Sequence, residues 1–206
     1  MSTIESKQLE KVKNLYSNGY SAREIAQHLN TSIDAVYYFF RSNGIPRRSP
    51  KEQNRVLFER KKPSFALKEK LTIKETELFI AGVMLYWGEG SQWDGEVNVD
   101  FANSKPEMIK VFVRFLRVVC AVNEKRLRCY LYCYSNQDVR KLVAYWSTVT
   151  NIPTIQFTKP YIRKDFDVSK INKMPYGLIH IRYSDKKLLL QLREWIKEVP
   201  KQFEEM

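Results

Sequence analysis

Residues 29–37 read Leu-Asn-Thr-Ser-Ile-Asp-Ala-Val-Tyr, and this stretch decides the fold of the N-terminal part of the chain. The Asn-Thr pair forms a turn, and Ser32 is a typical N-cap for a helix over residues 33–43. Gly44 and a proline two positions later then end that helix. The pattern therefore predicts a tight turn that leads into a short, well-delimited helix.

Two more short helices precede this turn. The second helix begins at Ser21, which forms a capping box with Glu24, and it runs to about Leu29. The first helix spans residues 6–17, where apolar side chains recur at helical spacing: Leu9, Val12, Leu15 and Tyr16. Three helices in about forty residues predict a small all-α domain, which we place at residues 1–48.

The turn and its flanking helices resemble the helix-turn-helix of resolvases and invertases, in which a capping Ser starts the reading helix and Val plus an aromatic residue follow. The resemblance covers residues 6–48. It implies a DNA-binding domain whose third helix presents its N-terminal half to base edges in the major groove. With Val36 and the two phenylalanines packed inward, the candidate DNA-contacting residues of this helix are Ser32, Ile33, Asp34, Tyr37, Tyr38 and Arg41. In the alternative interpretation, Ile33 and Tyr37 cover the small core.

The charge of the chain favours a polyanionic partner. Its net charge is +12, with 35 Lys and Arg against 23 Asp and Glu, and such an excess binds phosphates with release of counterions. A basic surface that only keeps the protein soluble explains the same net charge, so the sequence motifs must distinguish the two explanations. Arg47 and Arg48 are candidates for an arm that enters the adjacent minor groove, or they begin an ordinary solvated linker. We interpret residues 49–71 as a basic linker, partly helical around residues 53–60.

The remaining composition excludes several classes of protein. Three cysteines without paired spacing argue against a disulfide framework or a four-ligand zinc site. The first residues lack the apolar core of a signal peptide, and the longest apolar run, residues 78–87, is about half the length of a membrane span. We therefore expect no membrane partner and a cytoplasmic protein, nucleoid-associated if the source is a prokaryote.

Residues 72–206 predict an α+β domain. Thr72 and Glu75 form a capping box before a nearly all-apolar helix that continues to Trp87. Alternating and helical patterns then predict a strand over 97–101, a helix capped by Ser104, a strand over 126–134, a helix over 137–150, strands over 155–159 and 176–183, and a last helix over 188–196.

Residues 80–90 read Ile-Ala-Gly-Val-Met-Leu-Tyr-Trp-Gly-Glu-Gly and resemble the signature helix of the LAGLIDADG homing endonuclease family. The α-β-β-α-β-β-α plan of that family also resembles residues 72–199. In the family, two such helices pack face to face through small residues, and each delivers a carboxylate to a metal ion at the scissile phosphate. The resemblance implies that Glu89 is a catalytic, metal-binding carboxylate and that Mg²⁺ is the ion. Alternatively, Gly-Glu-Gly is only a helix stop with a solvated Glu89, and we interpret Asp94 and Asp100 as surface residues.

The strand over 126–134 alternates between two kinds of side chain, with Leu and Cys on one face and basic and aromatic residues on the other. In the family that this domain resembles, a concave sheet lies along the DNA, which implies contacts from that second face. The candidate DNA-binding residues of the domain are Arg126, Arg128, Tyr130, Tyr132, His180 and Arg182. The alternative is an ordinary amphipathic sheet with tyrosines at its rim.

Together these patterns predict a fold with an all-α helix-turn-helix domain plus an α+β domain resembling the LAGLIDADG homing endonuclease fold. The leading expectation is a sequence-specific, double-stranded DNA-binding protein that acts as a regulator. Gly82 and Glu89 stand seven positions apart where the family has five, which resembles regulators that carry such a domain without nuclease activity. The alternative is an active Mg²⁺-dependent endonuclease, which with one Gly-Glu-Gly motif has to form a homodimer. An RNA-binding module is a third class, which the helix-turn-helix disfavours.

Overall fold

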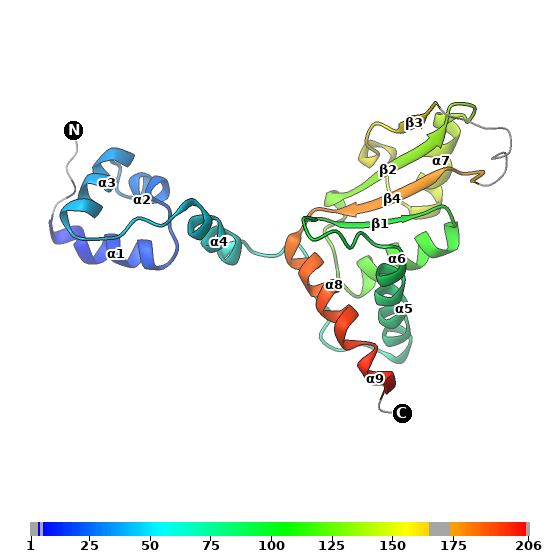
Figure 1. The fold of residues 1–206 in the computed structure, drawn as a ribbon, viewed down its shortest axis with the longest axis horizontal. Helices are drawn as coiled ribbons and strands as arrows, with labels where there is room; N and C mark the ends of the chain where they lie inside the picture. Colours follow the sequence, from blue (N-terminus) through cyan, green and yellow to red (C-terminus); the bar gives the residue numbers. More distant parts are fainter. Residues whose placement is uncertain (1–3, 5, 165–173, 205–206) are drawn as a thin grey trace. The chain divides into compact units, whose positions relative to one another are not determined.

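The computed structural model describes residues 4, 6–164 and 174–204 and divides the chain into two compact units, Met1–Lys62 and Pro63–Met206 (Figure 1). The N-terminal unit is all-helical. Its elements are a short 3-10 helix η1 (Ser6–Gln8), α1 (Leu9–Ser17), α2 (Ala22–His28), α3 (Ile33–Ser42) and α4 (Pro50–Arg60). The first three α-helices coincide closely with those that the sequence predicts.

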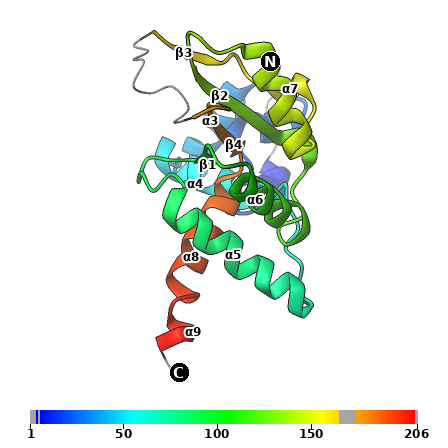
Figure 2. The same ribbon diagram turned by 90° about the vertical axis from the view of Figure 1, so that its right-hand side faces the viewer.

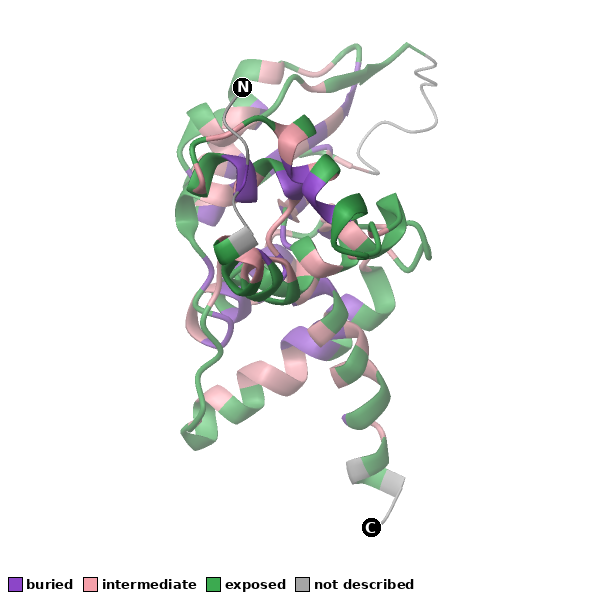
Figure 3. Cartoon of the chain, turned by 90° about the vertical axis from the view of Figure 1, so that its left-hand side faces the viewer, coloured by how far each residue is buried: buried purple, intermediate pink, exposed green. Residues whose placement is uncertain are grey.

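The core of the N-terminal unit is small and lies among α1, α2 and α3. The buried side chains include Val12, Ile25 and Val36, together with Phe39 and Phe40. Figure 3 shows the helices of the chain with buried and exposed residues along the same helix, as amphipathic helices must have. The prediction that Val36 and the two phenylalanines point inward is therefore confirmed.

The connection between α2 and α3 is held by its own hydrogen bonds. Both halves of the Ser21–Glu24 capping box are present at the start of α2. Asn30 adopts the left-handed conformation with φ 51°, and the Thr31 backbone N–H donates to the carbonyl of Ala26 at 2.9 Å. The Ser32 hydroxyl then accepts a hydrogen bond from the Ala35 N–H at 3.1 Å. These bonds satisfy backbone groups at the ends of the two helices and define the turn.

The predicted linker over residues 49–71 is confirmed in one respect, since the helix expected around residues 53–60 is present, but it is not a solvated connection, because both of its halves belong to folded units. Residues 50–60 form helix α4, and its Arg60 donates to the carbonyl of Gly19 at 2.7 Å and stacks 4.2 Å from the centroid of the Tyr20 ring. Residues 63–71 lie on the second unit, where Phe65 and Leu71 pack against its core. Apolar burial and cation–π contacts thus order a segment whose charge and prolines suggest a solvated chain.

The C-terminal unit is a mixed α/β fold, as predicted at this coarse level. Its strands form a four-stranded sheet in the order β1-β4-β2-β3. β4 pairs antiparallel with β1 and with β2, whereas β2 and β3 run parallel. The elements are α5 (Ile73–Glu89), β1 (Val99–Asn103), α6 (Pro106–Val118), η2 (Glu124–Arg126), β2 (Leu127–Tyr134), α7 (Val139–Thr150), η3 (Thr154–Gln156), β3 (Tyr161–Arg163), β4 (Leu178–Tyr183), α8 (Lys186–Glu198) and α9 (Lys201–Glu204).

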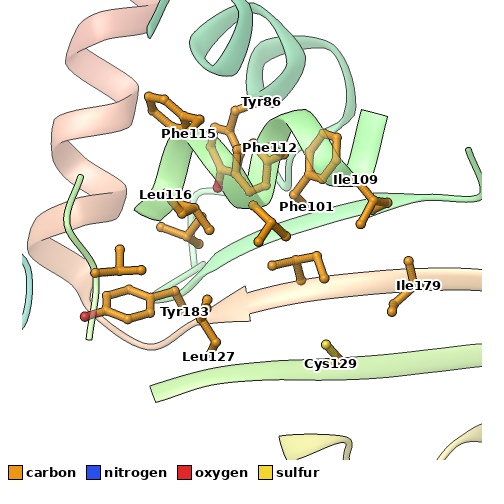
Figure 4. Packing of buried hydrophobic residues seen from close by; sticks show 14 of the residues in the cluster. Tyr86, Phe101, Ile109, Phe112, Phe115, Leu116, Leu127, Cys129, Ile179 and Tyr183 are labelled. Carbon is orange, nitrogen blue, oxygen red and sulfur yellow. The ribbon is translucent and has the colours of Figure 1, made fainter. Parts of the chain in front are cut away.

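One face of the sheet is buried under helices. Figure 2 shows α5, α6 and α8 on that side, and Figure 4 shows aromatic rings between helices and strands. The Phe112 ring of α6 stacks on Phe101 of β1 at 4.2 Å between centroids, and Tyr86 of α5 stacks on Phe112 at 5.8 Å. Gly82 allows α5 to approach α6, because a Cβ at this position would lie 2.2 Å from Cγ of Phe115. Among the described residues, no helix is long and apolar enough to cross a bilayer.

Two predictions of secondary structure in this unit are wrong. Residues 155–159 do not form a strand: Thr154–Gln156 is a 3-10 helix, Ile155 is 90% exposed, and Phe157 makes one isolated bridge to Cys129. Prolines on both sides of this segment lack an N–H for a sheet ladder, and β3 begins after the second one. Helix α6 is not capped by Ser104 but begins at Pro106, whose fixed φ suits the first helical position.

Candidate nucleic-acid interface

Helix α3 presents a polar stripe to solvent. Asp34, Tyr38 and Arg41 are exposed and stand at positions i, i+4 and i+7, so they share one face of the helix. Tyr38 is 62% exposed, so most of its ring is accessible to a partner. An aromatic ring, a carboxylate and a guanidinium on one face offer stacking, hydrogen-bond acceptance and hydrogen-bond donation.

Ser32, Ile33 and Tyr37 lie at the edge of this stripe. Ile33 and Tyr37 are half-buried and pack against the core of the unit, so the alternative in which they cover the core describes their packing. The Ser32 hydroxyl is used for the helix cap. The Arg47 guanidinium stacks 3.9 Å from the centroid of the Tyr37 ring, which places an exposed cation beside α3.

Arg48 differs from its neighbour Arg47, although the sequence predicts one role for both. Its guanidinium donates to the carbonyls of Tyr16 and Tyr20 and to the Gln53 side chain, and it stacks 4.0 Å from the centroid of the Tyr16 ring. Its backbone N–H also donates to the Tyr16 hydroxyl at 2.7 Å. Arg48 therefore ties α1 to α4 inside the unit, and only Arg47 keeps the exposure that a minor-groove arm needs.

The second candidate surface is the face of the sheet opposite the helices. The predicted alternation along β2 and β4 is confirmed, since Leu127, Cys129, Leu131, Ile179 and Ile181 are buried in the core. Side chains of neighbouring strands that are paired in register share a face. One row of this open face is Asp100, Arg182 and Arg128, and the next is Ala102, His180 and Tyr130.

Tyrosines extend the open face across β2 to β3. The Tyr132 ring lies 5.2 Å from the Tyr130 ring, 5.2 Å from the Tyr161 ring and 4.9 Å from the His180 ring, measured between centroids. Tyr161 is 52% exposed. Tyr161 was not predicted from the sequence because the strand was expected at residues 155–159, and the parallel register between β2 and β3 brings this ring beside Tyr132.

Two predicted arginines of this domain take positions at the end of the sheet. Arg126 lies in η2, before the strand begins, and its guanidinium donates to the carbonyl of Ser184. Arg128 is exposed, and its guanidinium donates to the carbonyls of Lys125 and Leu127 at 2.7 Å each. By its register with Arg182, Arg128 belongs to the open face. Arg126 instead stabilises the connection between β4 and α8 through its hydrogen bond to Ser184.

Asp100 is the residue whose sequence interpretation fails most clearly, because it is buried rather than on the surface. Its carboxylate lies 2.8 Å from Nδ1 of His180 and 2.7 Å from Nε of Arg182, and the side chain is 9% exposed. Burial alone raises the pKa of Asp100, but the hydrogen bonds and charges of His180 and Arg182 outweigh burial and keep its pKa below the usual value. Asp100 is therefore a charged anchor for two cationic or polar side chains.

Glu89 is the last residue of α5 and is exposed. Its carboxylate has no hydrogen bond or ion pair among the described residues. Within the same part of the chain, no group of three His, Cys, Asp or Glu side chains gathers where a metal ion can bind. The resemblance implies that Gly82 contacts a partner helix. In the structure Gly82 faces Phe115 of the same unit. At Gly88 of the same helix a Cβ would meet nothing within 4 Å.

Comparison of the chain with family models, with curated proteins and with solved structures gives no match.

Proposed function

We propose that this protein binds double-stranded DNA in a sequence-dependent way and acts as a regulator, with α3 of the N-terminal unit in the major groove. The observation that carries the proposal is the exposed stripe of Asp34, Tyr38 and Arg41 on a helix that is capped at Ser32 and braced by α2. A helix fits the major groove of B-DNA, and an Arg side chain at its surface can donate two hydrogen bonds to a guanine edge. Arg47, stacked on Tyr37, adds a cation beside this helix.

The C-terminal unit supplies the second part of the proposal, which is a broad contact with the DNA backbone. The open face of its sheet combines Arg128, Arg182 and His180 with the rings of Tyr130 and Tyr132. Cationic side chains bind phosphates and tyrosine hydroxyls donate to them, so this chemistry positions a protein on DNA without specifying a base. The net charge of +12 supports the same partner.

The alternative, a Mg²⁺-dependent endonuclease, has Glu89 as its support. An exposed carboxylate at the end of α5 can bind a metal ion if a second copy of the chain brings another carboxylate beside it. Asp100 does not serve as that second ligand, because His180 and Arg182 occupy its carboxylate oxygens. We therefore rank binding without cleavage above hydrolysis.

Selection of bound duplexes from a random DNA pool tests the proposal. The full chain should enrich a defined sequence, and the double variant Tyr38→Ala, Arg41→Ala should bind the selected site no better than a scrambled site, a loss of discrimination of about tenfold or more. Arg55→Ala is the matched control, because it removes the same charge from an exposed position of α4. A double variant that keeps the full preference would contradict the assignment of α3.

The same duplex then separates regulator from nuclease. We expect the selected DNA to stay intact with Mg²⁺ and the wild-type chain. Cleavage that Glu89→Gln abolishes while binding persists would support the endonuclease alternative instead.

A further inference from the structure

The cluster of Asp100, His180 and Arg182 lies on the open face of the sheet and joins residues eighty positions apart in the chain. Asp100 is held on β1, and its two carboxylate oxygens engage two side chains of β4 at once. We infer that this cluster is a binding site for one phosphate group, and that in the DNA complex the group is a phosphodiester of the backbone. This inference rests on the proposed DNA binding and assigns the residues that carry its backbone contact.

The hydrogen bonds of the cluster determine which atoms are left for a ligand. The Asp100 carboxylate accepts a hydrogen bond from Nε of Arg182, and the two terminal nitrogens of that guanidinium have no hydrogen-bond partner among the described residues. The same carboxylate is hydrogen-bonded to Nδ1 of His180, and Nε2 of that ring is likewise without a partner in the described part of the chain. A guanidinium fork is the donor that phosphate oxygens accept best. Because the Nδ1–H of His180 is given to Asp100, Nε2 donates to a phosphate only when the ring carries protons on both nitrogens. The carboxylate thus orients both side chains before the ligand arrives.

The two arginines in the row of Asp100 favour an anion, against the nearby carboxylate of Glu96. Arg128 of β2 stands directly opposite Arg182 of β4, on the same face as Asp100. Two arginines against one carboxylate leave the row with one positive charge, and the Arg128 guanidinium, which donates to the carbonyls of Lys125 and Leu127, has no carboxylate beside it among the described residues. The same excess of arginine disfavours a metal cation. Phosphate is therefore the ligand class that balances the row.

The surroundings fit a nucleic-acid phosphate better than an isolated anion. Arg182 stacks 5.1 Å from the centroid of the Tyr130 ring, and the rings of Tyr132 and Tyr161 continue the surface away from the cluster. Arg182 has a side chain that is 40% exposed, whereas that of His180 is 18% exposed. A ligand that reaches both groups lies along the sheet surface, as a sugar-phosphate backbone does, with tyrosine hydroxyls available to its neighbouring groups.

The decisive experiment is the substitution Asp100→Asn in the full chain, compared with Asp94→Asn. Both changes remove one negative charge from the same unit, but Asp94 is exposed, and among the described residues no hydrogen bond or ion pair joins it to the cluster. Long-range electrostatics alone predicts that both variants bind DNA more tightly. Our proposal predicts the opposite for Asp100→Asn: binding to a labelled duplex weakens about fivefold, because the neutral amide no longer orients His180 and Arg182. Asp94→Asn binds as well as the wild type or better.

A second variant covers the case in which Asp100→Asn disturbs folding. Arg182→Gln changes a partly exposed side chain, and it should weaken binding about tenfold and lower the slope of log affinity against log salt concentration by about 0.9, the value for one lost phosphate contact. His180→Gln should weaken binding with little change in slope. An Asp100→Asn variant that is folded by circular dichroism and binds as tightly as Asp94→Asn, or an Arg182→Gln variant with unchanged slope, would overturn the site.

Nuclear magnetic resonance of the imidazoles separates this inference from the proposed function. The chain has two histidines, His28 and His180, so His28→Gln assigns the His180 ring. We expect the His180 Nε2 resonance to shift with a duplex oligonucleotide and, at much higher concentration, with inorganic phosphate. A shift with phosphate while no duplex binds supports the site and removes the DNA proposal. Duplex binding without any shift at His180 removes the site and leaves the DNA proposal standing.

Discussion

The two units present their candidate contact residues in different ways. In the N-terminal unit, Asp34, Tyr38 and Arg41 lie on one helix, so their common face follows from helical geometry alone. In the C-terminal unit, Asp100, Arg182 and Arg128 come from three strands and meet only through the register of the sheet. The geometry of a surface on one helix depends on that helix and on the helix packed against it. The geometry of a surface across strands depends on the entire core that aligns the strands. The stability of the second unit should therefore limit its binding more strongly.

The largest effect that separates the units is expected at Gly82. Gly82→Ala places a Cβ 2.2 Å from the buried Phe115 ring, and we expect it to lower the free energy of unfolding of the C-terminal unit by about 3 kcal/mol. All four tryptophans, Trp87, Trp93, Trp146 and Trp195, belong to this unit. Tryptophan fluorescence during urea unfolding therefore reports on it alone.

Gly88→Ala is the matched control, because a Cβ at that helical position meets nothing within 4 Å. The higher helix propensity of Ala should stabilise the same unit by up to about 1 kcal/mol. Equal destabilisation by both substitutions would show that the contact between α5 and α6 is not the tight one described.

An intermediate effect is expected at Asp185, which connects the start of the unit to its last long helix. Its carboxylate accepts hydrogen bonds from the Ser64 N–H at 2.8 Å, from the Ser64 hydroxyl at 2.7 Å and from the Lys187 N–H at 2.9 Å. Burial raises the pKa of Asp185, but these hydrogen bonds and Arg126 keep it below the usual value. We expect Asp185→Asn to cost about 2 kcal/mol at pH 7.

The pH dependence of that cost follows from the lowered pKa. A group whose pKa is lower in the folded state adds stability above its unfolded pKa of 3.8, and this contribution is lost as the pH falls through the folded value. The difference between wild type and Asp185→Asn, measured by urea unfolding, should thus be constant from pH 7 to about pH 5 and shrink below about pH 4. A difference that stays the same at pH 3 would contradict an ionised Asp185.

The smallest effect is expected in the N-terminal unit, at Arg48. Arg48→Lys keeps the charge but loses the fork that reaches Tyr16, Tyr20 and Gln53, which should cost about 1 kcal/mol. Amide hydrogen exchange in α1 and α4 measures this cost, since the unit holds no tryptophan. Arg47→Lys is the control and should leave exchange unchanged while weakening DNA binding. The reverse pattern would exchange the roles assigned to the two arginines.

The N-terminal helices were predictable because their signals are local. Capping residues and apolar spacing lie within a few positions of one another, and the structure places α1, α2 and α3 close to the predicted bounds. In the segment over residues 49–71 the helix was predicted but its packing was not, because the packing depends on partners such as Gly19 and Cys120 that lie far away in the chain. Charge and proline content describe a segment, but they do not show what it packs against.

In the C-terminal unit, the alternation of side chains along the sequence determined which faces of β2 and β4 are buried, since a strand has a period of two. The sequence by itself also determined the exposed stripe of α3 and the mixed α/β character of the second unit. Only the tertiary structure decided that Asp100 is buried against His180 and Arg182, and that Gly82 serves the contact with Phe115. The physical reason is register: periodicity assigns a side chain to a face, but strand pairing and helix packing choose its neighbour on that face.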